Sequence, residues 1–273
     1  MSDRLFAGSI PEFYDRILVP LIFAVYADDL AARLARLAPN RVLEIAAGTG
    51  VLTRAMAKQL PAEARIVASD LNQPMLDHAR ARQVEDKRIT WEQADAQALR
   101  FSDRAFDAVA CQFGAMFFPD KVGAYREARR VLKPGGHFLF NVWDRIADSE
   151  FADVITAALA ELFPDDPPRF LARTPHGYHD PDLIRAQLTA AGFTGISIDT
   201  LERRSFARSP EEPAIAYCQG TPLRNEIEAR KTVSLDDATK VASDALARRF
   251  GTGPIDGRIR ALVVTATNGV ENA

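Results

Sequence analysis

The residues of this chain best suited to chemistry are three acidic side chains and one turn of small residues. Glu44 lies in the stretch VLEIAAGTG, where a short apolar run leads into a small-residue turn that ends at Gly50. A nucleotide-like cofactor can approach the backbone closely at such a turn, because small side chains leave room for it. Asp70 follows twenty residues after Gly50, and Asp95 comes later in QADAQAL. These carboxylates could accept hydrogen bonds from ribose hydroxyls and from an adenine amino group.

Apolar side chains accompany the two later carboxylates. Leu71, Met75 and Ala96 could cover the two faces of an adenine ring. Gln112 and Phe113 end the run VACQF and should emerge at the same rim. We therefore expect one adenosine-binding rim built from several strand ends.

The elements that position these residues are strands and helices in alternation. The expected strands are Val42–Ile45, Arg65–Asp70, Ile89–Gln93, Phe106–Cys111 and His137–Trp143. The expected helices are Val51–Gln59, Gln73–Arg82 and Lys121–Leu132, with Pro134-Gly135-Gly136 as the turn after the third. Such alternation predicts an α/β fold with a mostly parallel sheet and helices on both faces. Ligands bind at the carboxyl ends of the strands in open sheets of this kind.

Beyond Trp143 the pattern is looser. We expect helices at 148–163 and 180–191, a proline-rich loop at 164–178, and a strand at 193–200. A long helical stretch at about 210–250 and a short strand at 260–267 follow. These insertions predict a single domain, 1–273, with its core at about 30–145, 180–204 and 258–268. The remaining segments, at about 1–29, 146–179 and 205–257, would form a helical cap.

Composition narrows the classes of function. The 273 residues carry a net charge of -3, which argues against a sequence-independent nucleic-acid binder. No apolar run reaches about 18 residues, and the N-terminus lacks the features of a secretory signal, so neither a membrane span nor export is expected. Two cysteines are too few for a disulfide framework, and reduced thiols in the cytoplasm fit best. The oligomeric state stays open, a homodimer included.

Five stretches in order give the sequence a family resemblance. VLEIAAGTG, ASDLNQPML, ADAQAL, FDAVACQFGAMFFPD and RRVLKPGG resemble successive motifs of the class I S-adenosylmethionine-dependent methyltransferases. The similarity is to the group of ubiquinone/menaquinone-biosynthesis enzymes and their small-molecule relatives, and it covers about residues 10–143. It implies a Rossmann-like seven-stranded sheet whose last strand is antiparallel. Ala46 stands where the first motif most often has glycine.

The resemblance also implies roles for individual residues. The turn at Gly48, Thr49 and Gly50 would line the methionine end of S-adenosylmethionine, and Glu44 would face its ammonium or sulfonium side. Tyr14 resembles a tyrosine that covers the cofactor in related enzymes. The expected cofactor contacts are Tyr14, Glu44, Ala46, Gly48, Thr49, Gly50, Asp70, Leu71, Met75, Asp95, Ala96, Gln112 and Phe113.

The sequence indicates the methyl acceptor much less specifically than it indicates the cofactor. We expect a small, partly apolar acceptor under the helical cap, near Tyr14, Phe113 and Phe117, with an oxygen, nitrogen or carbon as the methylated atom. His176 and His179 form an H-x-x-H pair that could supply a general base, since histidine titrates near neutrality. The pair alone does not predict a metal site.

Two alternatives remain open. An NAD-dependent oxidoreductase would share the turn and the carboxylate at Asp70, but Thr53 stands where its fingerprint requires a small residue. A non-catalytic protein that keeps only the S-adenosylmethionine site is the second.

Overall fold

The computed structural model describes residues 10–269 and divides into two compact units. Of the described residues, unit 1 comprises 10–24, 143–178 and 202–261. Unit 2 comprises 25–142, 179–201 and 262–269. The division falls within three strands of the sheet, so each unit takes part of them.

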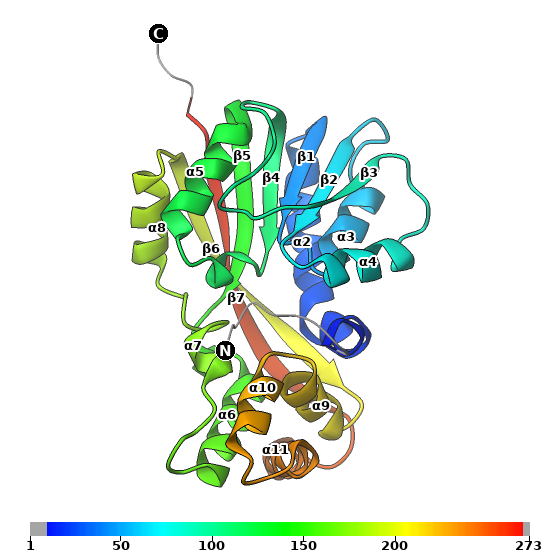
Figure 1. The fold of residues 1–273 in the computed structure, drawn as a ribbon, viewed down its shortest axis with the longest axis vertical. Coiled ribbons are helices and arrows are strands. Elements are labelled where there is room, and N and C mark those ends of the chain that lie inside the picture. The colour runs from blue at the N-terminus through cyan, green and yellow to red at the C-terminus, as the bar shows by residue number, and fades with distance from the viewer. Residues whose placement is uncertain (1–9, 270–273) are drawn as a thin grey trace. The chain divides into compact units, whose positions relative to one another are not determined.

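The strands form one sheet in the order β3-β2-β1-β4-β5-β7-β6, whose first five members can be followed across Figure 1. Their bounds are β1 (Arg41–Ile45), β2 (Arg65–Asp70), β3 (Ile89–Gln93), β4 (Phe106–Gln112), β5 (Leu132–Trp143), β6 (Thr194–Ala207) and β7 (Ile255–Thr267). Neighbours among β1 to β5 pair in parallel. β7 runs antiparallel to β5, since Gly135 donates to the carbonyl of Asn268 and Asp144 to that of Arg260. The predicted α/β sheet with an antiparallel last strand is confirmed.

Helices cover both faces of the sheet in unit 2. They are α2 (Ala24–Arg36), α3 (Val51–Gln59), α4 (Gln73–Arg82), η2 (Ala115–Phe117), α5 (Lys121–Val131) and α8 (Pro181–Ala190). On one face Leu30 and Leu34 of α2 and Met56 of α3 are fully buried in a core cluster that also contains Val42 of β1. On the other face Tyr125 of α5 packs its ring on Phe138 and Phe140 of β5. Leu139 of β5, between these two phenylalanines, belongs to the first cluster, so alternate residues of one strand contact opposite layers.

Unit 1 is mostly helical. Its helices are α1 (Ile10–Phe13), η1 (Tyr14–Phe23), η3 (Ile146–Asp148), α6 (Glu150–Leu162), α7 (Phe170–Arg173), α9 (Glu211–Gln219), α10 (Leu223–Arg230) and α11 (Leu235–Phe250). Phe151 of α6 is fully buried and meets Phe250 of α11 edge-on at 5.2 Å between ring centroids. Gly257 of β7 is matched to this core, because a Cβ there would lie 2.8 Å from the Phe151 ring.

Several predicted boundaries were wrong at places where tertiary contacts override local pattern. Pro134 to Gly136, predicted as a turn, belong to β5, where the register with β4 shifts. β6 continues to Ala207 and β7 begins at Ile255, so both extend beyond the expected strands. The predicted loop at 164–178 contains the short helix α7.

The segment that contains Tyr14 also differs from the amphipathic α-helix that its pattern suggests. It is a π-helix, η1, with Pro20 inside it. Proline lacks the amide hydrogen that an ordinary α-helical bond requires, and irregular turns are where helices accommodate it. Among the described helices, none is both long and apolar enough to cross a membrane.

Candidate functional site

The predicted cofactor residues of unit 2 meet at the carboxyl ends of β1 to β4. The pairing registers place Ile45 beside Ser69 and Asp70 beside Gln93, so the ends of three strands are aligned. Glu44 pairs with Ala110 on the other side of β1. Because parallel strands end at one edge of the sheet, side chains from residues far apart in sequence converge there.

The small-residue turn after β1 depends on left-handed backbone. Ala46, Gly48 and Gly50 have φ angles of 55°, 56° and 78°. Gly50 is required for a second reason, since a Cβ there would lie 2.9 Å from the Trp91 ring of β3. Alanine in this conformation costs about 1–2 kcal/mol, a strain that native proteins retain mainly at functional sites. Ala46 therefore adopts the backbone that the motif requires without being glycine.

Glu44 is buried beneath this turn. The hydroxyl of Thr53 in α3 donates to its carboxylate at 2.5 Å. Burial raises the pKa of Glu44 to about 8, although Thr53 and the positive charge of Arg54 oppose the shift. In the free protein near neutral pH the carboxyl group is therefore mostly protonated, and a positive group placed beside it would favour ionisation.

Asp70 joins the loops that follow β1 and β2. Its carboxylate accepts the amide of Gly48 at 2.8 Å and that of Asn72 at 2.8 Å. Burial raises its pKa, and these donors pull the pKa down again. Each carboxylate oxygen can accept more than one hydrogen bond, so Asp70 can hold the turn and still accept from a ribose.

Asp95 follows β3 and is half-buried. One oxygen, Oδ1, accepts the amide of Gln97 at 2.9 Å. None of the described residues hydrogen-bonds to the other oxygen, Oδ2. The next residue, Ala96, is buried, and so is Met75 of α4, whereas Leu71 is 42% exposed. This set combines one available acceptor with apolar surface, as an adenine ring requires.

The end of β4 is shaped by its contacts with β1 and β5. Phe113 has a left-handed φ of 49°, and its amide donates to the side chain of Asn141 at 3.0 Å. Gly114 packs so tightly that a Cβ there would lie 2.5 Å from the Cβ of Ala46 and 2.8 Å from the sulfur of Cys111. Gln112 and Phe113 are both buried.

Two further observations fit a zwitterionic amino-acid tail at the turn. Among the described residues, no side chain caps the N-terminus of α3, where backbone amides and the helix dipole favour an anion. The hydroxyl oxygen of Thr49 is buried, and none of the residues that the structure describes forms a hydrogen bond with it. The unused donors, with Glu44 below, suit a carboxylate and an ammonium group respectively.

The remaining predicted residues do not all lie in unit 2. Tyr14 belongs to unit 1, where its ring stacks on Phe23 at 4.8 Å. His176 also belongs to unit 1 and His179 to unit 2, so the H-x-x-H pair is divided between the units. The described residues contain no cluster of three or more histidine, cysteine or acidic side chains placed to hold a metal ion.

His176 is buried and held in a defined orientation. Its Nδ1 lies 2.7 Å from the carbonyl oxygen of Asp144. A carbonyl only accepts, so Nδ1 carries the hydrogen and the lone pair of the neutral ring is on Nε2. A row of aromatic rings begins at His176. The ring centroids of His176 and Trp143 are 6.0 Å apart, those of Trp143 and Phe23 are 5.9 Å apart, and Phe23 stacks on Tyr14.

Four residues of the site carried too little signal in the sequence to be predicted. Thr53 was counted only as a defect in a dinucleotide fingerprint, yet it binds Glu44. Asn141 and Trp91 sit within strands that look like ordinary core. For Gly114 the only signal was its residue type, because a glycine just after a strand often marks a close approach of another part of the chain.

Comparisons with known sequences identify relatives of this chain. A family model described as a methyltransferase domain matches residues 42–136. The ubiquinone/menaquinone biosynthesis C-methyltransferase UbiE of Stutzerimonas stutzeri is 31% identical over 209 residues, which are 72% of this chain and 77% of the relative. The corresponding protein of Pseudomonas paraeruginosa is 31% identical over 170 residues, which span 58% of this chain and 66% of that relative, just under two thirds of its length.

Solved structures share the fold at lower sequence identity. The YcgJ protein of Bacillus subtilis has a TM-score of 0.57 at 21% identity, over 91% of this chain and 100% of that one. Phosphoethanolamine N-methyltransferase 2 of Haemonchus contortus, solved with phosphomonomethylethanolamine and S-adenosylhomocysteine, has a TM-score of 0.54 at 18% identity. That match covers 96% of this chain and 61% of the other. None of these comparisons supports an NAD-dependent oxidoreductase.

Proposed function

Because the chain belongs to the class I S-adenosylmethionine-dependent methyltransferases, we propose that it methylates a small, partly apolar molecule. The enzyme class and its cofactor follow from the family. The observation that carries the rest is the convergence of Glu44, Asp70 and Asp95 at the ends of three adjacent strands. The acceptor class and the residue roles below are our proposals.

The proposed roles follow the chemistry of each group. Asp70 accepts from the ribose hydroxyls, and Oδ2 of Asp95 accepts from the adenine amino group. Met75 and Ala96 cover the ring. The first-turn amides of α3 and the Thr49 hydroxyl hold the carboxylate of the amino-acid tail, and Glu44 faces its ammonium group.

S-adenosylmethionine supplies an activated methyl group on a positively charged sulfur when it is bound. The contribution of the protein is then to align an acceptor atom at about 3 Å and to exclude water. A rigid rim suits this task, and the strained backbone at Ala46 and Phe113 is fixed by contacts on both sides. Apolar surroundings also protect the reacting centre from solvent.

We infer the chemical class of the acceptor from aromatic side chains of unit 1. The row Tyr14, Phe23 and Trp143 favours a flat or apolar molecule, since aromatic rings stack on such surfaces. An acceptor that is a carbon acid or a weakly ionised hydroxyl needs a general base. We assign that role to His176 rather than His179, because the carbonyl of Asp144 fixes its tautomer. The C-methyltransferase names of the relatives favour a carbon acceptor.

An acceptor screen tests the proposal. The purified chain is incubated with S-adenosylmethionine labelled on the methyl group and with quinols, phenols, amines and carboxylic acids. We expect label transfer to a quinol or phenol and none to the acids. Tight cofactor binding without transfer to any acceptor would favour the non-catalytic alternative instead.

A substitution at Asp95 tests the cofactor assignment separately. Asp95→Asn can keep the bond from the Gln97 amide while replacing the Oδ2 acceptor with a donor. Loss of one hydrogen bond to a charged acceptor should weaken binding of S-adenosylhomocysteine by about 10- to 100-fold. An analogue that lacks the adenine amino group should bind wild type and variant alike. Equal loss for both ligands would contradict the assignment.

A further inference from the structure

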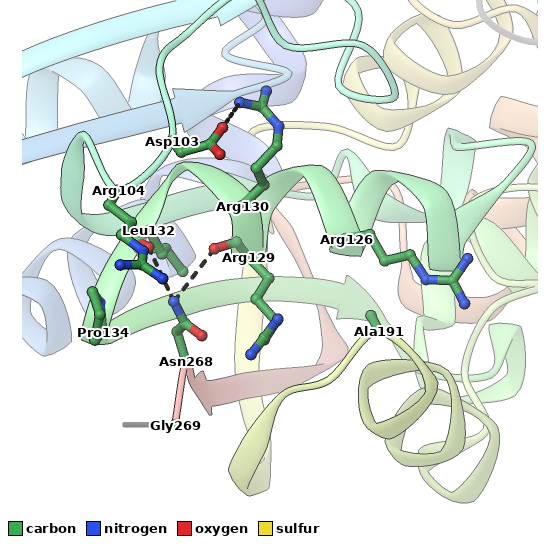
Figure 2. A pocket seen from close by; sticks show the side chains of 10 residues that line it. All are labelled: Asp103, Arg104, Arg126, Arg129, Arg130, Leu132, Pro134, Ala191, Asn268 and Gly269. Carbon is green, nitrogen blue, oxygen red and sulfur yellow. Dashed lines mark hydrogen bonds and ion pairs between the residues drawn. The ribbon is translucent and has the colours of Figure 1, made fainter. Parts of the chain in front are cut away.

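A polar cavity lies in unit 2, away from the carboxyl ends of the strands. Its volume is about 230 Å³. It is lined by residues of α5, by the first residues of β5, and by the residues that follow β7 and α8. The lining comprises Asp103, Arg104, Arg126, Arg129, Arg130, Leu132, Pro134, Ala191, Asn268 and Gly269 (Figure 2). Because β5 begins here, the cavity lies at the amino ends of the parallel strands, whereas the proposed cofactor site lies at their carboxyl ends.

The charge of the cavity is strongly positive. Four of its lining residues are arginines and one is acidic. Arg130 is neutralised, since it pairs with Asp103 at 2.6 Å and with Glu127 at 2.8 Å. No carboxylate of the described residues pairs with Arg126 or Arg129. Figure 2 shows Arg130 turned to Asp103, whereas Arg129 extends toward Asn268 and Ala191.

Arg129 provides the second observation. Its Nε is buried and has no hydrogen-bond partner among the described residues. Gly192 leaves room for this guanidinium group. A Cβ at that position, where φ is 89°, would lie only 3.0 Å from Nε of Arg129. Buried donors nearly always have an acceptor, so an unpaired one beside a cavity points to an acceptor supplied from outside.

The frame around the cavity is rigid. The side chain of Asn268 donates to the carbonyls of Leu132 at 3.0 Å and of Lys133 at 3.1 Å. These bonds join the end of β7 to the start of β5 and hold the cavity wall in place. A binding site built on such a frame requires little ordering when a ligand arrives.

We infer that this cavity binds a small phosphate-bearing molecule through Arg126 and Arg129. The guanidinium group presents parallel donors that match the oxygens of a phosphate, and it remains charged at every relevant pH. A volume of about 230 Å³ exceeds that of one water, roughly 30 Å³, several times over, so the site has room for a phosphate with a small organic group. The ligand is therefore a phosphate monoester, and the protein thereby has a second ligand site.

Binding of phosphates to the full chain tests this inference. Inorganic phosphate and ribose 5-phosphate are titrated by calorimetry at constant ionic strength, with ribose as the uncharged comparison. We expect both phosphates to bind, ribose 5-phosphate more tightly, and ribose not to bind. Equally tight binding of both phosphates would overturn the monoester assignment, and binding of ribose alone would overturn the site.

Three variants locate the site. Arg129→Gln and Arg126→Gln should each raise the dissociation constant for ribose 5-phosphate at least about tenfold. Arg36→Gln removes the same charge from an exposed position of α2 outside the cavity and should leave it unchanged. Unaltered binding of S-adenosylhomocysteine by each variant shows that it is folded. Equal affinity for phosphate in all variants, or equal weakening by Arg36→Gln, would overturn the inference.

Discussion

The buried carboxyl group of Glu44 should make cofactor affinity depend on pH. With a pKa of about 8 in the free protein, most molecules hold this group protonated below neutrality. The proposed position of the cofactor ammonium next to Glu44 favours the ionised form. Binding must therefore release a proton, and affinity should rise with pH until Glu44 is ionised in the free protein.

The size of the effect follows from the fraction of Glu44 that is already ionised. For a pKa of about 8, this fraction is about 1% at pH 6.0 and about 9% at pH 7.0. Since apparent affinity scales with the competent fraction, the dissociation constant should fall about eightfold between these two pH values, once the small loss of cofactor ammonium is included. At pH 6.5 each binding event should release about 0.9 proton.

Calorimetric titration with S-adenosylmethionine measures both quantities. The pH series runs from 6.0 to 7.0, because an α-amino group with a pKa of about 7.7 is still mostly protonated throughout this range. Repeating the titrations in buffers of different ionisation enthalpy gives the number of protons released.

Two variants are the controls. Glu44→Gln keeps the shape but cannot ionise, so its affinity should be flat across the series. Thr53→Val removes the hydroxyl that favours the ionised carboxylate, and the rise in affinity should move to higher pH. An affinity independent of pH in wild type, or the same slope in Glu44→Gln, would refute the reasoning.

The same group should make the free protein less stable as pH rises. The pKa of Glu44 is raised from an ordinary 4.5 to about 8 by folding, so between these values the folded state holds a proton that the unfolded chain has lost. The contribution of Glu44 to stability is therefore full below about pH 4.5 and falls until about pH 8, by an amount on the order of 5 kcal/mol. Urea unfolding of wild type and Glu44→Gln at pH 5 and 8 measures it, and parallel behaviour of the two proteins would contradict it.

Two further predictions concern the turn at β4 and the proposed base. Gly114→Ala should destabilise the protein by about 1–3 kcal/mol in urea unfolding, because its Cβ would lie 2.5 Å from that of Ala46. Gly253→Ala, with nothing within 4 Å, should not, and an equal loss in both would count against the packing argument. His176→Gln should lower kcat about 10²- to 10⁴-fold while cofactor affinity stays the same. His179→Gln should leave kcat unchanged, and the reverse ranking in steady-state kinetics would reject His176 as the base.

The alternation of strands and helices up to Trp143 was predictable because hydrophobic periodicity and turn residues act locally. The seven-stranded sheet and its antiparallel last strand follow from that alternation together with the family resemblance. The full lengths of β6 and β7 were not predictable, since a strand end is decided by the neighbour with which it pairs. The π-helix at Tyr14 was hidden for a related reason, because its apolar spacing is also that of an ordinary helix.

Site residues could be predicted where the residue type alone indicates its chemistry. They could not be predicted where the role depends on a tertiary contact. Carboxylates at strand ends pointed to a rim, and the registers align Asp70 with the end of β3. Asn141 gave no such signal, because its hydrogen bond to Phe113 joins residues that are 28 apart in sequence. The arginine-lined cavity likewise assembles from several segments, so no local pattern could reveal it.

A crystal structure with S-adenosylhomocysteine would test the central claim most directly. The account predicts the ribose hydroxyls on the carboxylate of Asp70, the adenine amino group on Oδ2 of Asp95, and the amino-acid tail over the Gly48 turn. Adenosine bound at any other place in the chain, or facing neither carboxylate, would contradict it.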